Sequence, residues 1–236
     1  HDFLEYMKQV PYFRKYNHHR MTFGLTYFTS EKYILVLSHD EVVHLKCSMI
    51  NKMPGFQTDK FANLKAGYTF MLGHPGKKLL FMGQDFGQYH EWDEKVALDW
   101  YLAEEPLNSG LQSYVRDLLH LYKKYPCLYE QDYDWDGFQW INANDGDRSI
   151  FSFVRFSRDH RHSLLFVINF TPMARPDYRV GVPKKGSYTL VLDNLHGMYR
   201  RGDKAPVFRS LKRECDGRDY SIGYSLPPYG TAVFRF

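Results

Sequence analysis

The chain has 236 residues, of which 44% are apolar and 17% aromatic, and its formal net charge is +4. The length and the apolar share predict a globular protein with a substantial core. The positive charges form no sustained run, and no apolar stretch approaches the roughly 18 residues of a membrane span. We therefore expect neither nucleic acid nor a membrane as a partner. The high aromatic share is typical of β-rich cores, and also of proteins that stack aromatic rings on sugars.

The cysteine pattern bears on the compartment and on metal binding. Cys47, Cys127 and Cys215 are odd in number and far apart in the sequence. This pattern predicts free thiols in a reducing compartment, which indicates a cytoplasmic protein, and it argues against a disulfide framework or a zinc site. The neighbouring His18 and His19 are favoured as surface residues rather than metal ligands, because no third ligand is suitably spaced. We expect no metal.

The first half of the chain predicts alternating helices and strands. Residues 1–20 predict a helix that breaks near Pro11, and residues 21–27 a strand or a helical turn. Because that helix is already under way at the first residue, we expect an upstream part of the protein to be missing. The remaining elements are an apolar strand, a helix that stops at Gly73, a second apolar strand and a further helix, at residues 32–37, 59–72, 78–82 and 111–125.

This alternation indicates a parallel α/β sheet, and both strands are expected to be buried between helices. After Pro126 the pattern changes to many short strands with turn residues between them, which favours an antiparallel β-sandwich. Asn144-Asp145-Gly146 is a hairpin signal between the first two of these strands. We place the domain boundary near residue 129. The predicted strands cover residues 137–141, 149–154, 163–169, 187–192 and 230–236.

Polar residues follow both strands of the predicted parallel sheet. His39-Asp40 comes directly after the first strand, and the loop 84–92, which ends in Glu91-Trp92, comes after the second. The carboxyl ends of parallel strands are where ligands bind in barrels and open sheets. The alternative for His39-Asp40 is a strand-end turn in which Asp40 caps a helix. The alternative for Trp92 is packing against the rim of the sheet.

The motifs around these residues match a known family. His39-Asp40-Glu41-Val42-Val43-His44 is followed, in fitting order and spacing, by Lys60-Phe61-Ala62-Asn63-Leu64, Pro75-Gly76-Lys77-Lys78-Leu79-Leu80-Phe81-Met82-Gly83, Glu91-Trp92, Leu98-Asp99-Trp100 and Asn169-Phe170-Thr171-Pro172. With these motifs the whole chain resembles the 1,4-α-glucan (glycogen) branching enzymes. The His-Asp pair by itself indicates only the wider α-amylase family, whereas the first and third motifs are specific to branching enzymes.

The resemblance implies a fold in two parts. Residues 1–129 correspond to the C-terminal portion of a (β/α)8 TIM barrel, with 32–37 as its seventh strand, 78–82 as its eighth and 111–125 as the eighth helix. Residues 130–236 correspond to the all-β domain that follows the barrel. The expected fold class is thus α/β plus all-β.

The resemblance also implies a reaction and its site. Branching enzymes cleave an α-1,4-glucan and transfer the piece to form an α-1,6 branch by retaining glycosyl transfer. Asp40 corresponds to the transition-state stabiliser, His39 contacts the same sugar, and Glu91 and Trp92 are expected to bind substrate. The nucleophile and the general acid belong to the fourth and fifth strands, so the isolated chain is expected to be inactive. The expected partners are an α-glucan such as amylose or glycogen and the missing N-terminal part, and no cofactor is implied.

The sequence departs from the family in two places. Leu45 stands after the first motif where the family usually has Gly, and Gln84-Asp85 stands after the second strand where it usually has Asn-Glu. The second change borders the site and could alter the acceptor side. Two other functions stay open from the sequence: an α-glucan hydrolase of the same wider family, and a non-catalytic glucan-binding or degenerate fragment.

Overall fold

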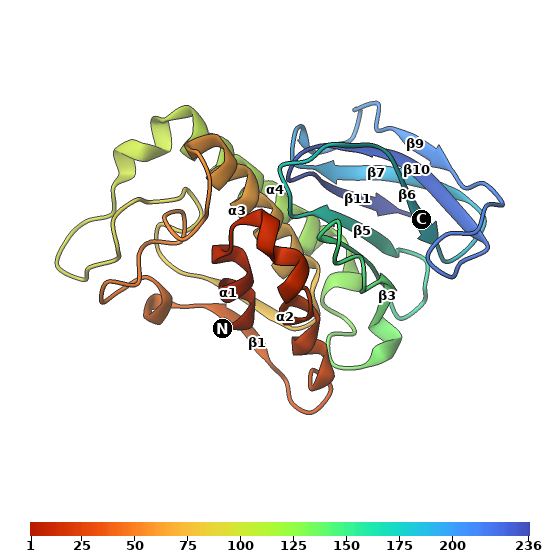
Figure 1. Ribbon diagram of the computed structural model, residues 1–236, viewed down its shortest axis with the longest axis horizontal. Helices are drawn as coiled ribbons and strands as arrows, with labels where there is room; N and C mark the ends of the chain where they lie inside the picture. Colours follow the sequence, from red (N-terminus) through yellow and green to blue (C-terminus); the bar gives the residue numbers. More distant parts are fainter.

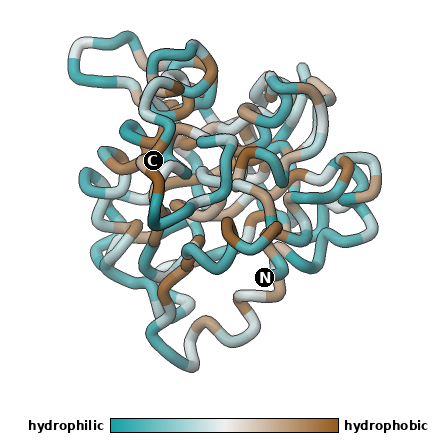
Figure 2. Tube along the Cα trace, turned by 90° about the vertical axis from the view of Figure 1, so that its left-hand side faces the viewer, coloured by the Kyte–Doolittle hydropathy of each residue, from teal (hydrophilic) through white to brown (hydrophobic).

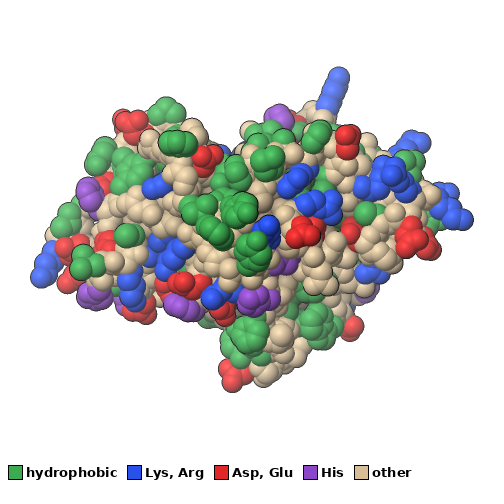
Figure 3. Space-filling view, viewed as in Figure 1, with side chains coloured by type: hydrophobic (Ala, Val, Ile, Leu, Met, Phe, Trp, Pro, Cys, Tyr) green, Lys and Arg blue, Asp and Glu red, His purple; other side chains and the backbone are tan.

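The computed structural model describes residues 1–236 as a helical region with one pair of short strands beside a β domain (Figure 1). In Figure 2 the projecting loops are mostly hydrophilic, and the hydrophobic stretches run through the interior. Figure 3 shows Lys and Arg side chains gathered over the β domain, while acidic, basic and His side chains are interspersed over the helical region. None of the helices combines the length and the apolar character needed to cross a membrane.

The N-terminal segment is helical and broken at Pro11, as predicted. It consists of four short pieces: α1 (Asp2–Lys8), η1 (Pro11–Asn17), α2 (His19–Thr22) and η2 (Phe23–Thr26). The break follows from Pro11, which has no backbone N–H to continue α1 and instead opens the 3-10 helix η1. Residues 21–27 therefore form helical turns, one of the two predicted alternatives.

The parallel strand pair predicted from the alternating pattern is present. β1 (Ile34–Leu37) pairs with β2 (Lys77–Leu80) in parallel, with Ile34 opposite Lys77 and Leu37 opposite Leu80. α3 (Gln57–Gly73) connects the two strands, and α4 (Pro106–Lys124) follows the second and packs against α3. The short helix η3 (His39–Glu41) lies between β1 and α3, and η4 (Trp100–Glu104) lies between β2 and α4.

The expected burial of this strand pair between helices is wrong. Ile34 and Val36 of β1 are 57% and 47% exposed, and Leu79 of β2 is 38% exposed. Side chains alternate across a strand, so these three residues share one face of the pair. The reason is that the sheet has only two strands, and the helices cover only its other face. β2 also ends at Leu80, two residues earlier than predicted.

Two further 3-10 helices, η5 (Pro126–Leu128) and η6 (Trp135–Gly137), lead into the β domain. Its main sheet has seven strands in the order β3-β4-β5-β11-β7-β8, with β9 also paired to β7, and β6 and β10 form a second sheet. All of these pairings are antiparallel. The strands are β3 (Phe138–Asn142), β4 (Ile150–Arg155), β5 (Leu164–Asn169), β6 (Arg175–Val182), β7 (Ser187–Asp193), β8 (Gly197–Met198), β9 (Val207–Arg209), β10 (Tyr220–Leu226) and β11 (Thr231–Arg235).

The seven-stranded sheet is covered on both faces. Phe153 and Phe166 belong to the core shared with α1, α3 and α4, whereas Val154 and Val167 belong to the core shared with β6 and β10. The helices approach this sheet closely at Gly73, where an added Cβ would lie 2.8 Å from the Phe153 ring. The expected antiparallel pairing of β3 with β4 is confirmed, and the expected two-layer β arrangement is present.

A buried ion pair connects the two regions of the molecule. The Asp132 carboxylate accepts hydrogen bonds from Arg155 Nη2 at 2.8 Å and Lys77 Nζ at 2.7 Å, and the side chains of Asp132 and Arg155 are fully buried. Arg155 Nη1 also donates to the Gly73 carbonyl at the end of α3, at 2.9 Å. Burial alone would raise the pKa of Asp132, but Arg155 and Lys77 outweigh it and lower that pKa below its usual value.

Candidate active site

The candidate site lies where the two parallel strands end. Because β1 and β2 run in the same direction, their carboxyl ends meet at one edge of the sheet. Ser38 continues β1 in an extended conformation, and the chain then turns into η3, which carries His39 and Asp40. Phe81 follows β2 at the same edge, and the rings of His39 and Phe81 lie 5.9 Å apart.

His39 and Asp40 both face solvent. His39 Nε2 lies 3.2 Å from Asp40 Oδ1, and their side chains are 54% and 72% exposed. No backbone N–H donates to the Asp40 carboxylate, and η3 has no side-chain cap, so Asp40 is not the helix-capping residue of the alternative interpretation. An exposed carboxylate held beside a histidine at a strand end can accept hydrogen bonds from the hydroxyl groups of a ligand.

Trp92 joins the same cluster from the loop after β2. Its indole lies 6.3 Å from the His39 ring at an interplanar angle of 69°, and 5.1 Å from the Phe81 ring at 81°. Trp92 is only partly buried and also packs against the large core, so both interpretations of this residue, sugar platform and rim packing, fit its position. The structure thus brings His39, Asp40 and Trp92 together.

The Glu91 carboxylate binds the backbone of a neighbouring turn. Oε2 accepts a hydrogen bond from the Leu45 N–H at 3.0 Å, and Oε1 accepts one from the Cys47 N–H at 2.6 Å. The segment that Glu91 holds has an unusual backbone, since His44, Leu45 and Cys47 all have φ between 56° and 66°. This left-handed conformation costs a non-glycine residue about 1–2 kcal/mol, so the two hydrogen bonds support a strained turn.

The two family departures have structural consequences. Leu45 is 95% exposed and has a φ of 64°, a conformation that Gly adopts without strain, so Leu in place of Gly makes this turn costlier to form. Gln84 is buried and its Oε1 accepts from the Phe81 N–H at 3.1 Å. Asp85 Oδ2 accepts from Gln112 of α4 at 3.1 Å. Both side chains therefore hold their own loop in place.

Two residues of this site, Phe81 and Lys46, were not among the predicted site residues. Lys46 Nζ donates to the Asp40 carbonyl at 2.7 Å, and Lys52 Nζ donates in turn to the Lys46 carbonyl. Both contacts are set by the turn at 44–47, which no local pattern predicts. His44 is exposed and makes no hydrogen bond. No group of three His, Cys, Asp or Glu side chains is placed to hold a metal ion.

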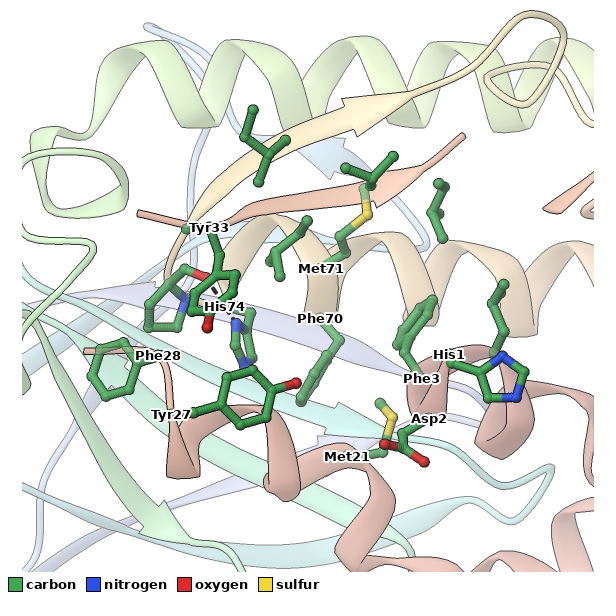
Figure 4. A pocket seen from close by; sticks show the side chains of 18 of the residues that line it. His1, Asp2, Phe3, Met21, Tyr27, Phe28, Tyr33, Phe70, Met71 and His74 are labelled. Atoms are coloured by element: carbon green, nitrogen blue, oxygen red, sulfur yellow. Dashed lines mark hydrogen bonds between the residues drawn. The ribbon is translucent and has the colours of Figure 1, made fainter. Parts of the chain in front are cut away.

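A large cavity lies elsewhere, beside β1. It measures about 370 Å³ and is bounded by β1, by the N-terminal helices and by α3. Figure 4 shows Phe70 and Met71 of α3, with His74 just after that helix, on one side. Met21 of α2 and Tyr27, which follows η2, face them. Glu41 lines this cavity, but His39 and Asp40 do not. The cavity therefore lies along the edge of β1 that has no neighbouring strand, and not at the candidate site.

Comparisons with a family model and with solved structures relate this chain to the α-amylases and similar enzymes. Residues 140–236 match the family described as "Alpha amylase, C-terminal all-beta domain". The whole chain superimposes on a type I pullulanase from Bacillus subtilis, solved in complex with maltose, with a TM-score of 0.70 at 12% identity over 35% of that chain. An α-amylase from H. orenii matches over 99% of this chain and 46% of its own with a TM-score of 0.58 at 16% identity. At these identities the likeness is one of fold, and residues 140–236 are similar in sequence to the C-terminal all-β domain of α-amylases.

Within this class, the chain is similar over its whole length to part of the 1,4-alpha-glucan branching enzymes, which confirms the resemblance found in the motifs. It is 57% identical to the 1,4-alpha-glucan branching enzyme of Butyrivibrio fibrisolvens over all of this chain and 37% of that protein. The corresponding protein of Gloeobacter violaceus is 45% identical over all of this chain and 32% of its own length, and that of Aquifex aeolicus 43% identical over 99% and 38%. The chain therefore spans about a third of the length of these relatives.

Proposed function

We propose that this chain contributes one side of the active site of a branching enzyme, which cleaves an α-1,4-glucan and rejoins the piece through an α-1,6 bond. The observation that carries the proposal is the cluster of His39, Asp40 and Trp92 at the shared end of β1 and β2. It lies in a chain whose relatives, at up to 57% identity over its whole length, are branching enzymes. The proposed substrates are α-glucans such as amylose and glycogen.

The proposed architecture is the last quarter of a (β/α)8 barrel, residues 1–129, followed by the β domain, residues 130–236. In this architecture β1 is the seventh strand, β2 the eighth and α4 the eighth helix. The uncovered apolar face of Ile34, Val36 and Leu79 supports it, because a closed barrel would cover that face with the other strands. The cavity along the open flank of β1 also supports it, since it is where a preceding strand would lie.

Asp40 is proposed to stabilise the transition state. Glycosyl transfer with retention passes through an oxocarbenium-like state, and hydrogen bonds to ring hydroxyls that strengthen in that state lower the barrier. The exposed Asp40 carboxylate is free to make such bonds, and His39 can contact the same sugar. Trp92 can pack against the ring. The sequence resemblance also implied a substrate contact for Glu91, and this stays a prediction.

The rest of the chemistry is proposed to come from residues outside this chain. A nucleophilic carboxylate and a carboxylic acid, about 5–5.5 Å apart, would come from the fourth and fifth strands of the barrel. The chain by itself would then bind a glucan weakly and catalyse nothing. The proposal requires no cofactor, and it is consistent with the cytoplasmic compartment that the cysteine pattern indicates.

Proton NMR of amylose treated with the complete protein, together with a count of reducing ends, tests the proposal. We expect new α-1,6 signals without a matching rise in reducing ends. A rise in reducing ends without α-1,6 signals would identify a hydrolase of the same class. No change in either measurement would indicate a glucan-binding or degenerate protein. Each of the last two results would overturn the proposed transfer reaction.

A further inference from the structure

The Glu91 carboxylate holds the turn that follows the His39-Asp40 motif. Each of its oxygens accepts one backbone N–H, from Leu45 at 3.0 Å and from Cys47 at 2.6 Å. Leu45 and Cys47 are left-handed, and neither position is a glycine, so this stretch of backbone does not keep its shape by intrinsic preference. Backbone N–H groups that converge in this way bind an anion, and here the anion is the side chain of Glu91.

Lys46 lies between the two N–H groups that Glu91 holds. Its Nζ reaches back and donates to the Asp40 carbonyl at 2.7 Å. The chain of contacts therefore runs from the Glu91 carboxylate through the backbone of Leu45 and Cys47 to the Lys46 side chain, and from there to the main chain of Asp40. The next residue, Trp92, fixes the beginning of the same segment, because its N–H donates to the Val42 carbonyl at 3.1 Å.

We propose that Glu91 is a positioning residue that sets the place of Asp40 through Lys46, rather than a residue that binds the sugar. The proposal rests on the proposed function of Asp40. Neither carboxylate oxygen of Glu91 is free of a backbone partner, so a sugar hydroxyl would have to share an oxygen already in use. Asp40, in contrast, presents a carboxylate that no backbone N–H occupies and that is 72% exposed. The division of roles follows from this difference.

The test uses the complete protein with the single variants Glu91→Gln and Lys46→Met and the double variant. Gln keeps the length of Glu91 but places an NH₂ group against one of the two N–H donors. A misplacement of about 1 Å can lower a rate about 100-fold, so we expect kcat for branching to fall by about 10- to 100-fold in each single variant. KM is expected to stay within about twofold, because the sugar contacts remain.

The double variant separates positioning through Lys46 from an independent role. If both residues act on Asp40 by one route, the double variant loses no more kcat than the worse single variant. Losses that multiply, or a rise in KM with kcat unchanged, would overturn the proposal in favour of a sugar contact by Glu91. The matched control is Glu94→Gln, which removes the same charge three residues away from an exposed side chain without a hydrogen bond and should leave kcat unchanged.

Hydrogen exchange of the backbone amides decides the proposal without reference to activity. We expect faster exchange over residues 42–47 in Glu91→Gln than in the wild type, and no change in Glu94→Gln. If the wild type forms no α-1,6 bonds, the proposed function fails, while faster exchange would still support the contact between Glu91 and this turn. Unchanged exchange in Glu91→Gln would overturn the positioning role even in an active branching enzyme.

Discussion

β5 and β1 are both short and strongly apolar strands, but they differ in how far their side chains are buried. All six residues of β5 are buried, whereas Ile34 and Val36 of β1 are about half exposed. The difference lies in their neighbours. β5 has a strand on each side, helices over one face and the β6–β10 sheet over the other, while β1 has one neighbouring strand and helices over one face only. Burial is thus a property of the assembly around a strand and not of its sequence.

The contrast suggests that substitutions in the two regions act on different properties of the protein, namely its stability and its reaction. The core of the β domain and its contact with α3 are buried, so substitutions there should change the free energy of unfolding. The tips of β1 and β2 are open and exposed, so changes there should act on the reaction and leave stability nearly unaffected.

Neutralising the buried Asp132 carboxylate should lower the free energy of unfolding strongly. Asp132→Asn leaves the fully buried Arg155 without its counter-charge, which typically costs about 3–5 kcal/mol. Denaturant unfolding of the wild type and the variant at pH 7 measures this loss. Asp177→Asn removes a carboxylate of the same domain that is exposed and makes no hydrogen bond, and it should change nothing measurable. Equal effects of the two substitutions would mean that the buried ion pair of Asp132 and Arg155 does not stabilise the protein.

Asp40→Asn should show the opposite profile in the complete protein. Loss of one preorganised electrostatic contact to a transition state lowers kcat by about 10²–10³-fold. The unfolding midpoint should not change, because the Asp40 side chain is 72% exposed and its only polar partner is His39. Steady-state branching rates and thermal unfolding measure the two effects. Near-normal turnover would refute the proposed role of Asp40, and a large drop in stability would refute the division between the two regions.

A buried histidine in the contact between the two regions should make stability depend on pH. His18 stacks on Phe151 with ring centroids 3.9 Å apart, and its ring nitrogens have no hydrogen-bond partner. Burial lowers the pKa of His18 from 6.5 to about 4. The unfolded chain therefore binds this proton more readily, so the contribution to stability is present above pH 6.5 and is lost as the pH falls toward 4.

His18→Phe keeps the stacked ring and removes the titrating group. Between pH 7.5 and pH 4.5 the wild type should lose about 2 kcal/mol more stability than this variant does. Denaturant unfolding at the two pH values gives the comparison, and His19→Phe, at the neighbouring exposed position, is the control and should lose as much as the wild type. If His18→Phe loses as much stability as the wild type, the imidazole is not kept neutral by burial.

The same substitution in the two strands provides the sharpest contrast, although its effect is the smallest. Val167→Thr places a hydroxyl at a fully buried position of β5 and should cost about 1–3 kcal/mol. Val36→Thr in β1, where the side chain is 47% exposed, should change the stability of the 236-residue chain by less than about 0.5 kcal/mol. In the complete protein the two costs should become similar, because the proposed barrel covers Val36. Urea unfolding of both proteins measures these costs, and a Val36→Thr cost that is the same in both would argue against the barrel.

Local patterns predicted the elements that have strong periodicity or clear stop signals. The helices α3 and α4, the parallel strand pair and five strands of the β domain follow from apolar spacing and from Gly and Pro. The strand β6 was missed because it begins Arg175-Pro176-Asp177, which resembles a loop, and β10 because Gly223 and its serines interrupt the apolar pattern. Both form the outer layer of the domain, where polar residues face solvent.

The candidate site was predicted only in part, for a similar reason. His39 and Asp40 follow a strand directly, so a local pattern with a family motif is enough to find them. The contacts of Glu91 with Leu45 and Cys47 join residues 44 or more positions apart, and the Asp132–Arg155 pair joins residues 23 apart. Such contacts depend on how elements pack, and the residue types alone do not identify them.

A crystal structure of the complete protein with a bound maltooligosaccharide tests the central claim most directly, namely that the end of β1 holds the sugar whose bond is cleaved. We expect one sugar ring with hydroxyls within about 3.5 Å of both the Asp40 carboxylate and the His39 ring. We also expect Glu91 to stay bound to the Leu45 and Cys47 N–H groups. An oligosaccharide that occupies the barrel end but leaves Asp40 facing solvent would contradict it.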